Sequence, residues 1–106
     1  MNERAQVYAE TLAKLVRCET ISSFENSDLT KFRAFHQLLR ETFPRIFSVC
    51  EVEDFDGSLL MHWRGKDSGK EPVLLMNHHD VVEATGTWEH EPFSGDIADG
   101  KVWGRG

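Results

Sequence analysis

The sequence has little that would cross-link the chain or bind it to a polyanion. Its two cysteines, Cys18 and Cys50, lie far apart and form no C-x-x-C motif, so we expect free thiols rather than a disulfide framework. Lys and Arg number 12 against 18 Asp and Glu, and the net charge is −6 without any basic cluster. This charge balance argues against a nucleic-acid partner and against binding to an anionic membrane surface.

Residues 1–106 contain no stretch that is typical of the segments directing a protein into or across a membrane. Its opening residues, MNERAQVYAE, have neither the basic start nor the apolar core of a signal peptide. No apolar run approaches the roughly 20 residues that span a bilayer. We therefore expect a soluble, cytoplasmic protein, and the length of 106 residues suits a single domain with a modest core.

Apolar periodicity predicts two helices in the first part of the chain. Residues 2–18 carry apolar side chains at helical spacing. A polar stretch follows, and a second helix is predicted to begin at Ser27 or Asp28, whose side chains can accept hydrogen bonds from free backbone N–H groups. It should end before Pro44, which cannot continue a helix. His36 lies on or near the apolar stripe of this helix, where a packed side chain is commoner than a metal ligand.

Beyond the second helix, the residue pattern changes and predicts strands. Residues 45–54 and 58–64 are predicted to form a hairpin around the turn signal Asp56-Gly57. Residues 72–76, PVLLM, are an unbroken apolar run, which is typical of a central strand buried on both faces. Asp99-Gly100 indicates a second hairpin. The order of elements predicts an α/β fold in which helices pack on a mixed sheet.

The tripeptide His78-His79-Asp80 comes directly after the predicted central strand. Open α/β sheets bind their ligands beyond the carboxyl ends of strands, and His78 lies two residues past Met76. In an extended chain the side chains of His78 and Asp80 project from one side and that of His79 from the other. Neutral imidazole is a common zinc ligand, and a nearby carboxylate can fix its tautomer. We therefore predict His78 and Asp80 as a functional pair and His79 as a bystander.

Other interpretations of these three residues remain open. A histidine and an aspartate beyond a strand can simply hydrogen-bond local backbone as turn residues. Adjacent His and Asp also bind metal in HD-type phosphohydrolases, although that motif sits on a helix and the flanking apolar residues here favour strand. Alternatively, the whole chain is a small stand-alone α/β binding or interaction module in which the three residues have no catalytic role.

Two longer stretches carry a family resemblance. PVLLMNHHDVV and, further on, TWEHEPFSGDIADGKVWGRG resemble the start of the catalytic domain in the di-zinc metallopeptidases, the family of carboxypeptidase S, aminoacylase-1, the cytosolic dipeptidases and succinyl-diaminopimelate desuccinylase. That family's pattern is a strand, His-x-Asp-Val-Val, a loop with Trp, Pro-Phe-Ser-Gly, Asp-Gly and Gly-Arg-Gly. Every part occurs here in the same order. The resemblance is strong over residues 73–106 and weaker upstream.

The resemblance implies a metal site and an activity. Carried onto this sequence, His78 matches a ligand of one zinc, and Asp80 matches the catalytic aspartate that supports that ligand. The family binds two zinc ions per active site, with cobalt or manganese as alternatives, and hydrolyses peptide or N-acyl amino acid amide bonds with a metal-activated water. Two positions depart from the pattern, because His79 stands where Met or another apolar residue is usual and Glu83 where Pro is common.

The family's other metal ligands follow the matching motifs and are not found in residues 1–106. The resemblance thus implies that residues 1–106 are an incomplete N-terminal portion of a zinc-peptidase catalytic domain, with the remainder and any dimerisation domain outside it. One assigned ligand predicts weak zinc binding and no hydrolase activity for these residues alone. Uncovered sheet edges are expected to promote self-association, so a homo-oligomer is among the predicted partners.

Overall fold

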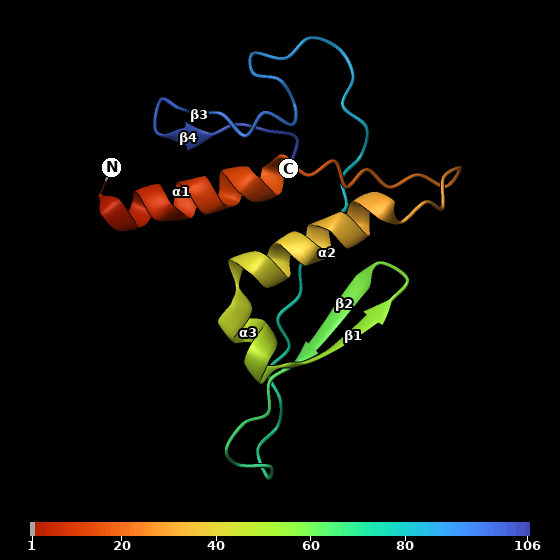
Figure 1. The fold of residues 1–106 in the computed structure, drawn as a ribbon, viewed down its shortest axis with the longest axis vertical. Helices are drawn as coiled ribbons and strands as arrows, with labels where there is room; N and C mark the ends of the chain where they lie inside the picture. Colours follow the sequence, from red (N-terminus) through yellow and green to blue (C-terminus); the bar gives the residue numbers. More distant parts are fainter. Residues whose placement is uncertain (1) are drawn as a thin grey trace.

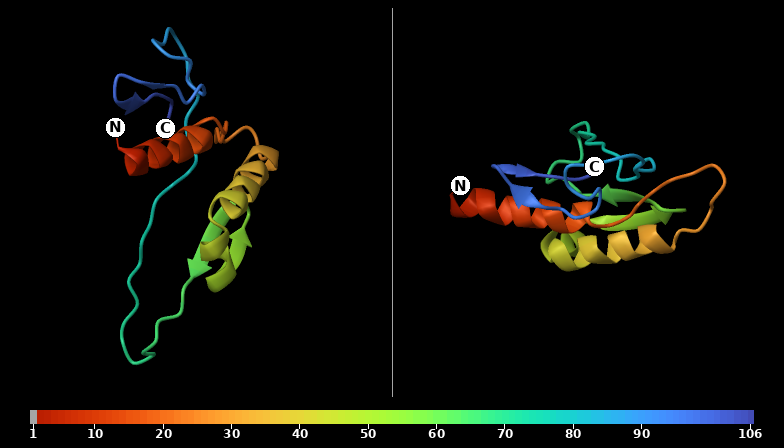
Figure 2. Two further views of the ribbon diagram at one scale, coloured as in Figure 1. Left: turned by 60° about the vertical axis from the view of Figure 1, so that its left-hand side comes forward. Right: turned by 90° about the horizontal axis from the view of Figure 1, so that it is seen from above.

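The computed structural model describes residues 2–106. Two groups of elements are visible in Figure 1, one built on the first helix and one on the second. A long irregular segment, residues 63–96, connects them, and its first part loops away from both in Figure 2. In chain order the elements are α1 (Glu3–Val16), α2 (Thr30–Thr42), α3 (Pro44–Val49), β1 (Glu51–Phe55), β2 (Ser58–His62), β3 (Ile97–Ala98) and β4 (Lys101–Val102).

Helix α1 forms where the sequence predicts it. The side chain of Asn2 accepts a hydrogen bond from the Ala5 N–H at 2.8 Å, which satisfies one of the free donors of the first turn. Ala13 and Val16 are buried on the inner face of the helix. This face packs against β3 and β4, so the first and the last elements of the chain lie side by side.

The second helix begins at Thr30, two or three residues later than the predicted start at Ser27 or Asp28, and it is followed by a short helix that was not predicted. Asp28 accepts hydrogen bonds from both the N–H and the hydroxyl of Thr30, where α2 begins. Helix α2 ends at Thr42, as expected from Pro44. Pro44 itself, however, is the first residue of α3, a position that suits its fixed φ and its missing N–H. The predicted strand over residues 45–54 is therefore wrong in its first half, and strand structure begins at Glu51.

Both predicted hairpins are confirmed. In the first, Phe55 pairs with Ser58 across a two-residue turn, and Asp56 and Gly57 have φ values of 50° and 98°. Positive φ at both central residues defines the turn type whose twist matches the strands. The Gly57 N–H donates to the Asp54 side chain at 3.0 Å, which stabilises the turn. The second hairpin, β3–β4, turns at Asp99-Gly100 in the same way.

The predicted central strand is the main error in the fold. Residues 72–76 form no strand, and Val73 and Leu75 are 86% and 90% exposed. A strand buried on both faces needs a neighbour at each edge and a layer on each side, and no strand within residues 2–106 pairs with this run. Residues 2–106 thus contain two separate antiparallel sheets, and parallel pairing within them is limited to the Ile21–Val81 bridge. The α/β class is confirmed.

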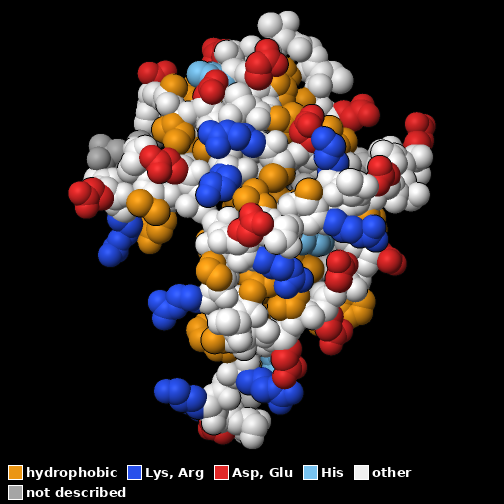
Figure 3. All heavy atoms as spheres, viewed as in Figure 1, with side chains coloured by type: hydrophobic (Ala, Val, Ile, Leu, Met, Phe, Trp, Pro, Cys, Tyr) orange, Lys and Arg blue, Asp and Glu red, His pale blue; other side chains and the backbone are white. Residues whose placement is uncertain are grey.

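The core is small and joins the two ends of the chain. Figure 3 accordingly shows many hydrophobic side chains among the charged groups of the visible face. Gly95 has a φ of 61°, and a β-carbon there would lie 2.5 Å from the Ala13 carbonyl oxygen, so only glycine allows this approach to α1. No helix within residues 2–106 has the length and apolarity needed to cross a membrane. The buried residues within residues 2–106 are Ala13, Val16, Thr20, Phe35 and His36.

Candidate functional site

Residues 79–81 lie in an extended segment that is paired to the loop after α1. The Val81 N–H donates to the Thr20 carbonyl at 2.8 Å, and the Ser22 N–H donates to the Val81 carbonyl at 3.0 Å. The Thr20 hydroxyl, which is buried, also donates to the His79 carbonyl at 2.6 Å. Three hydrogen bonds therefore fix the backbone at the predicted site, whereas the apolar run before it, residues 72–76, is not paired with any strand within residues 2–106.

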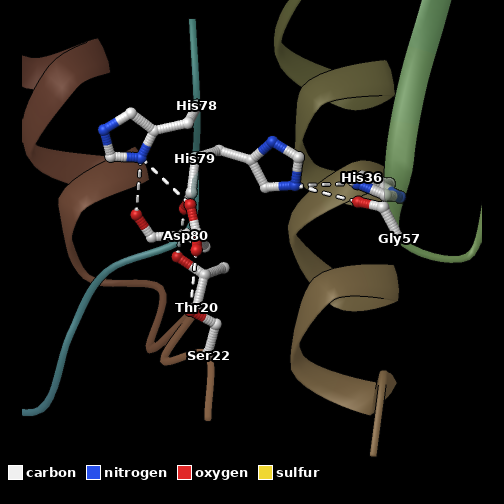
Figure 4. Close-up of polar contacts among 7 residues, drawn as sticks. All are labelled: Thr20, Ser22, His36, Gly57, His78, His79 and Asp80. Carbon is white, nitrogen blue, oxygen red and sulfur yellow. Dashed lines mark hydrogen bonds and ion pairs between the residues drawn. The ribbon is translucent and has the colours of Figure 1, made fainter. Parts of the chain in front are cut away.

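His78 and Asp80 lie on the same side of this segment, as the sequence predicts (Figure 4). His78 Nδ1 is 3.0 Å from Asp80 Oδ1 and 3.0 Å from the Asp80 carbonyl oxygen. Both partners only accept, so Nδ1 carries the proton. In the neutral ring Nε2 then has a free lone pair. The His78 side chain is 86% exposed, so this nitrogen is accessible to a ligand.

Ser22 completes the pair from the other side of the carboxyl group. Its hydroxyl donates to Asp80 Oδ2 at 2.6 Å, so each carboxyl oxygen has its own partner. This hydrogen bond is the main reason that the pKa of Asp80 is lowered, and His78 adds to the effect against the opposing influence of burial. Asp80 is therefore a carboxylate at neutral pH. Sequence reasoning missed Ser22, because no local pattern links two residues 58 positions apart.

His79 points the opposite way, towards α2, which confirms the predicted geometry of the tripeptide (Figure 4). Its ring stacks on Phe35 with centroids 5.2 Å apart and meets Phe32 edge to face. Its Nε2 is 3.1 Å from the Gly57 carbonyl oxygen and 3.3 Å from His36 Nε2. His79 therefore joins the site segment to α2 and to the turn of the first hairpin.

His36 is the buried partner of this inner contact. As expected from its place on the apolar stripe, it is packed, and only 4% of its surface is exposed. Burial is the main cause that lowers its pKa, and the neighbouring His79 lowers it further, whereas Asp54 acts in the opposite direction. Its Nδ1 has no hydrogen-bond partner and lies 3.8 Å from Asp54 Oδ2. The ring is thus held in its neutral form.

A second His–Asp pair, which the sequence did not indicate, lies near the C-terminal hairpin. His90 Nδ1 is 2.8 Å from Asp96 Oδ2, and the His90 ring stacks on Trp103 with centroids 4.3 Å apart. The His90 side chain is 25% exposed, so it is much less open than His78. The aspartate follows the histidine by six residues in an irregular loop, where no periodicity predicts which side chains meet.

Curated proteins with similar sequences are hydrolases. The chain is 37% identical over 105 residues to the probable carboxypeptidase S-like 2 of Dictyostelium discoideum and 36% identical over 111 residues to carboxypeptidase S of Saccharomyces cerevisiae, and each alignment covers 92% of the chain. It is also 38% identical over 109 residues, 98% of the chain, to the N-fatty-acyl-amino acid synthase/hydrolase PM20D1 of Xenopus tropicalis. The chain belongs to the carboxypeptidase S family of peptidases.

The other comparisons set the limits of this assignment. The chain spans about a fifth of the length of the curated relatives that it matches, as expected for a portion of a longer family member. No family model matches the chain. No solved structure matches it either.

The residues present fit one ligand of the family's metal site. Histidine is a common zinc ligand, and a ligating histidine usually donates its other ring N–H to a carboxylate or a carbonyl. His78 has both of these partners in Asp80. Within residues 2–106, however, no three His, Cys, Asp or Glu side chains are close enough together to enclose a metal ion. A zinc site of the kind that the resemblance implies would therefore need ligands from outside the described residues.

Proposed function

We propose that this chain contributes one side of the active site of a zinc-dependent hydrolase that cleaves peptide or N-acyl amino acid amide bonds. The observation that carries the proposal is the state of His78. Its Nδ1 is hydrogen-bonded to Asp80, while its Nε2 belongs to a side chain that is exposed to solvent. The sequence similarity to carboxypeptidase S supports the class of reaction.

The roles of the two residues follow from this geometry. His78 would bind one zinc ion through Nε2, and Asp80 would keep the proton on Nδ1 and prevent the ring from turning. The carboxylate would also stabilise the positive charge that the ring acquires when it donates to a cation. Zinc held there would supply an acidified water and would polarise the scissile carbonyl. His79 has no part in this chemistry, because its ring faces α2.

The substrate would be an amide with an amino acid on one side of the bond. The relatives' names include both carboxypeptidases and an N-fatty-acyl-amino acid synthase/hydrolase. These substrates share an amide bond next to an amino acid. We propose this class for the longer protein that contains residues 1–106.

Residues 1–106 alone are proposed to be inactive. A catalytic zinc site typically has three protein ligands, whereas His78 is the single assigned one here. One imidazole binds zinc weakly, so the isolated chain should show no zinc-dependent amide hydrolysis. Turnover by this polypeptide, purified free of contaminating hydrolase, would contradict the ligand assignment.

The proposal is tested in the complete reading frame to which residues 1–106 belong. His78→Ala should abolish both zinc retention and hydrolysis of an N-acyl amino acid or a dipeptide. His79→Ala, assayed at a temperature where the protein stays folded, should keep both. His90→Ala is a further control, because it removes a histidine that is also paired with an aspartate. Equal losses in the His78 and His79 variants would show that the wrong histidine has been assigned.

A further inference from the structure

We infer that Ser22 is a positioning residue for His78, acting through Asp80. The inference rests on the proposed role of His78 as a metal ligand. The three side chains form the order hydroxyl, carboxylate, imidazole, with distances of 2.6 Å from Ser22 Oγ to Asp80 Oδ2 and 3.0 Å from Asp80 Oδ1 to His78 Nδ1. Figure 4 shows the carboxyl group between the other two side chains.

The need for a third residue comes from the exposure of the pair. The Asp80 side chain is 46% exposed and that of His78 is 86% exposed, so water competes for every hydrogen bond between them. A carboxyl group with one partner can turn about its last side-chain bond and exchange that partner for water. With Ser22 on Oδ2, such a turn breaks two hydrogen bonds. The hydroxyl therefore fixes the plane of the carboxylate and, with it, the acceptor that faces Nδ1.

Ser22 can do this because its own backbone is fixed. Its N–H donates to the Val81 carbonyl, and the Thr20 carbonyl accepts from the Val81 N–H. These two hydrogen bonds place Ser22 next to the residue that follows Asp80. The remaining freedom of the serine is the rotation of its short side chain, and the hydrogen bond to Asp80 selects one rotamer.

The direction of the hydrogen bonds excludes a nucleophilic role. A nucleophilic serine donates its proton to an imidazole that acts as base. The Ser22 hydroxyl donates instead to the carboxylate, on the oxygen that His78 does not use. The effect of Ser22 on His78 is therefore indirect, and it concerns which ring nitrogen carries the proton.

The first test measures the tautomer of His78 in the metal-free chain by ¹⁵N NMR of the imidazole nitrogens at neutral pH. In the unmodified chain Nδ1 should give the signal of a protonated nitrogen and Nε2 that of an unprotonated one. Ser22→Ala should move both signals towards a mixture of tautomers. Ser22→Thr, which keeps a hydroxyl, should restore the original signals. An unchanged tautomer in Ser22→Ala would overturn the inference.

Three controls separate positioning from a general loss of structure. Ser23→Ala removes the neighbouring hydroxyl, which accepts from the Glu25 N–H and is not one of the groups in the Ser22–Asp80–His78 hydrogen bonds, so it should leave His78 unchanged. His90, paired with Asp96, is an internal reference whose signals should not move in any variant. If Ser22→Ala fails to fold, the comparison of Ser22→Thr with Ser22→Val, which differ in a hydroxyl against a methyl, decides the question in the same way.

The second test measures zinc affinity in the complete protein by competition with a chelator. Loss of groups that orient a metal ligand typically weakens binding by 10–100-fold. Because Ser22 acts one step further out than Asp80, we expect about a tenfold loss in Ser22→Ala and recovery in Ser22→Thr. Unchanged affinity in Ser22→Ala would overturn the inference. Zinc retention by His78→Ala would instead overturn the proposed function, while the NMR result would still decide the hydrogen-bond order of the three side chains.

Discussion

Residues 73–76 and residues 79–81 are close neighbours in the chain and have opposite environments. The first group is apolar and exposed, and the second contains two polar side chains and is held by hydrogen bonds to Thr20 and Ser22. The polar residues His79 and Asp80 are thus less exposed than the apolar residues before them, against the usual relation between polarity and burial. What decides the environment of each group is which partners lie within reach.

The difference teaches which kind of interaction a short chain can complete. A polar group is satisfied by one partner at hydrogen-bond distance, and the loop after α1 supplies such partners to residues 79–81. An apolar strand needs a layer of side chains on each face. Residues 2–106 do not provide those layers to residues 73–76. Three changes test this comparison, in order of decreasing effect on the free energy of unfolding.

The largest effect is expected from His79→Ala, which removes the inward anchor of residues 79–81. The substitution deletes the ring that stacks on Phe35 and removes the nitrogen that lies 3.3 Å from Nε2 of the buried His36. We expect a loss of about 1–3 kcal/mol in the free energy of unfolding, measured by urea titration. His78→Ala, at the exposed side of the same segment, should change it by less than about 0.5 kcal/mol. Similar values for the two variants would remove the distinction between the two sides.

An intermediate effect is expected from pH, through His36. Burial, His79 and Arg40 lower the pKa of this histidine, and Asp54 opposes them. The unfolded chain takes up a proton below its ordinary pKa of about 6.5, and the folded chain does not until its lowered pKa is reached. Stability should therefore be constant above about pH 6.5 and fall below it, by at most about 1.4 kcal/mol per pH unit for this group.

The measurement is urea unfolding between pH 5 and pH 8. The carboxyl groups with lowered pKa values, those of Asp28, Asp80 and Asp96 among them, lose their contribution as pH falls towards and below their ordinary range near pH 4, so they do not dominate this window. His36→Phe should reduce the slope below pH 6.5. His62→Gln, on a side chain that is 59% exposed, should leave the slope unchanged, and a reduced slope there would contradict the assignment to His36.

The smallest effect on stability is expected from Leu75→Lys, in the exposed group. Leu75 is 90% exposed, so the substitution should change the free energy of unfolding by less than about 0.5 kcal/mol. It should reduce self-association, because a charge opposes the pairing of exposed extended segments. Light scattering over a range of concentrations compares the two chains. A monomeric unmodified chain at high concentration would contradict the expectation that this group drives association.

The sequence predicts those parts of the fold that depend on neighbours in the chain. The Asp-Gly turns at residues 56–57 and 99–100 were correct, since positive φ at two successive positions is a local requirement. The prediction from Pro44 was half correct. The second helix does end before this residue, but a proline that ends one helix can also begin the next. The strand predicted at residues 72–76 was wrong. An apolar run forms a central strand only if other strands pair with it, and the sequence pattern of the run does not show whether they do.

The candidate site likewise has one part that the sequence predicts and one part that it does not. That His78 and Asp80 lie on one side and His79 on the other follows from the alternation of an extended chain, and the structure agrees. The partners that define the two sides could not be predicted. Ser22 reaches Asp80 across 58 positions and His36 reaches His79 across 43, and neither the loop residue nor the helical histidine carries a signal of its distant partner.

The contact between α1 and the C-terminal hairpin has a consequence for the synthesis of the protein. Arg17, directly after α1, donates to the Ser94 carbonyl, and 77 positions separate the two residues. At about 5–20 residues per second, α1 leaves the ribosome about 4–15 s before the residues against which it packs. During this interval the face that carries Ala13 and Val16 is without the C-terminal hairpin that packs on it in the folded chain.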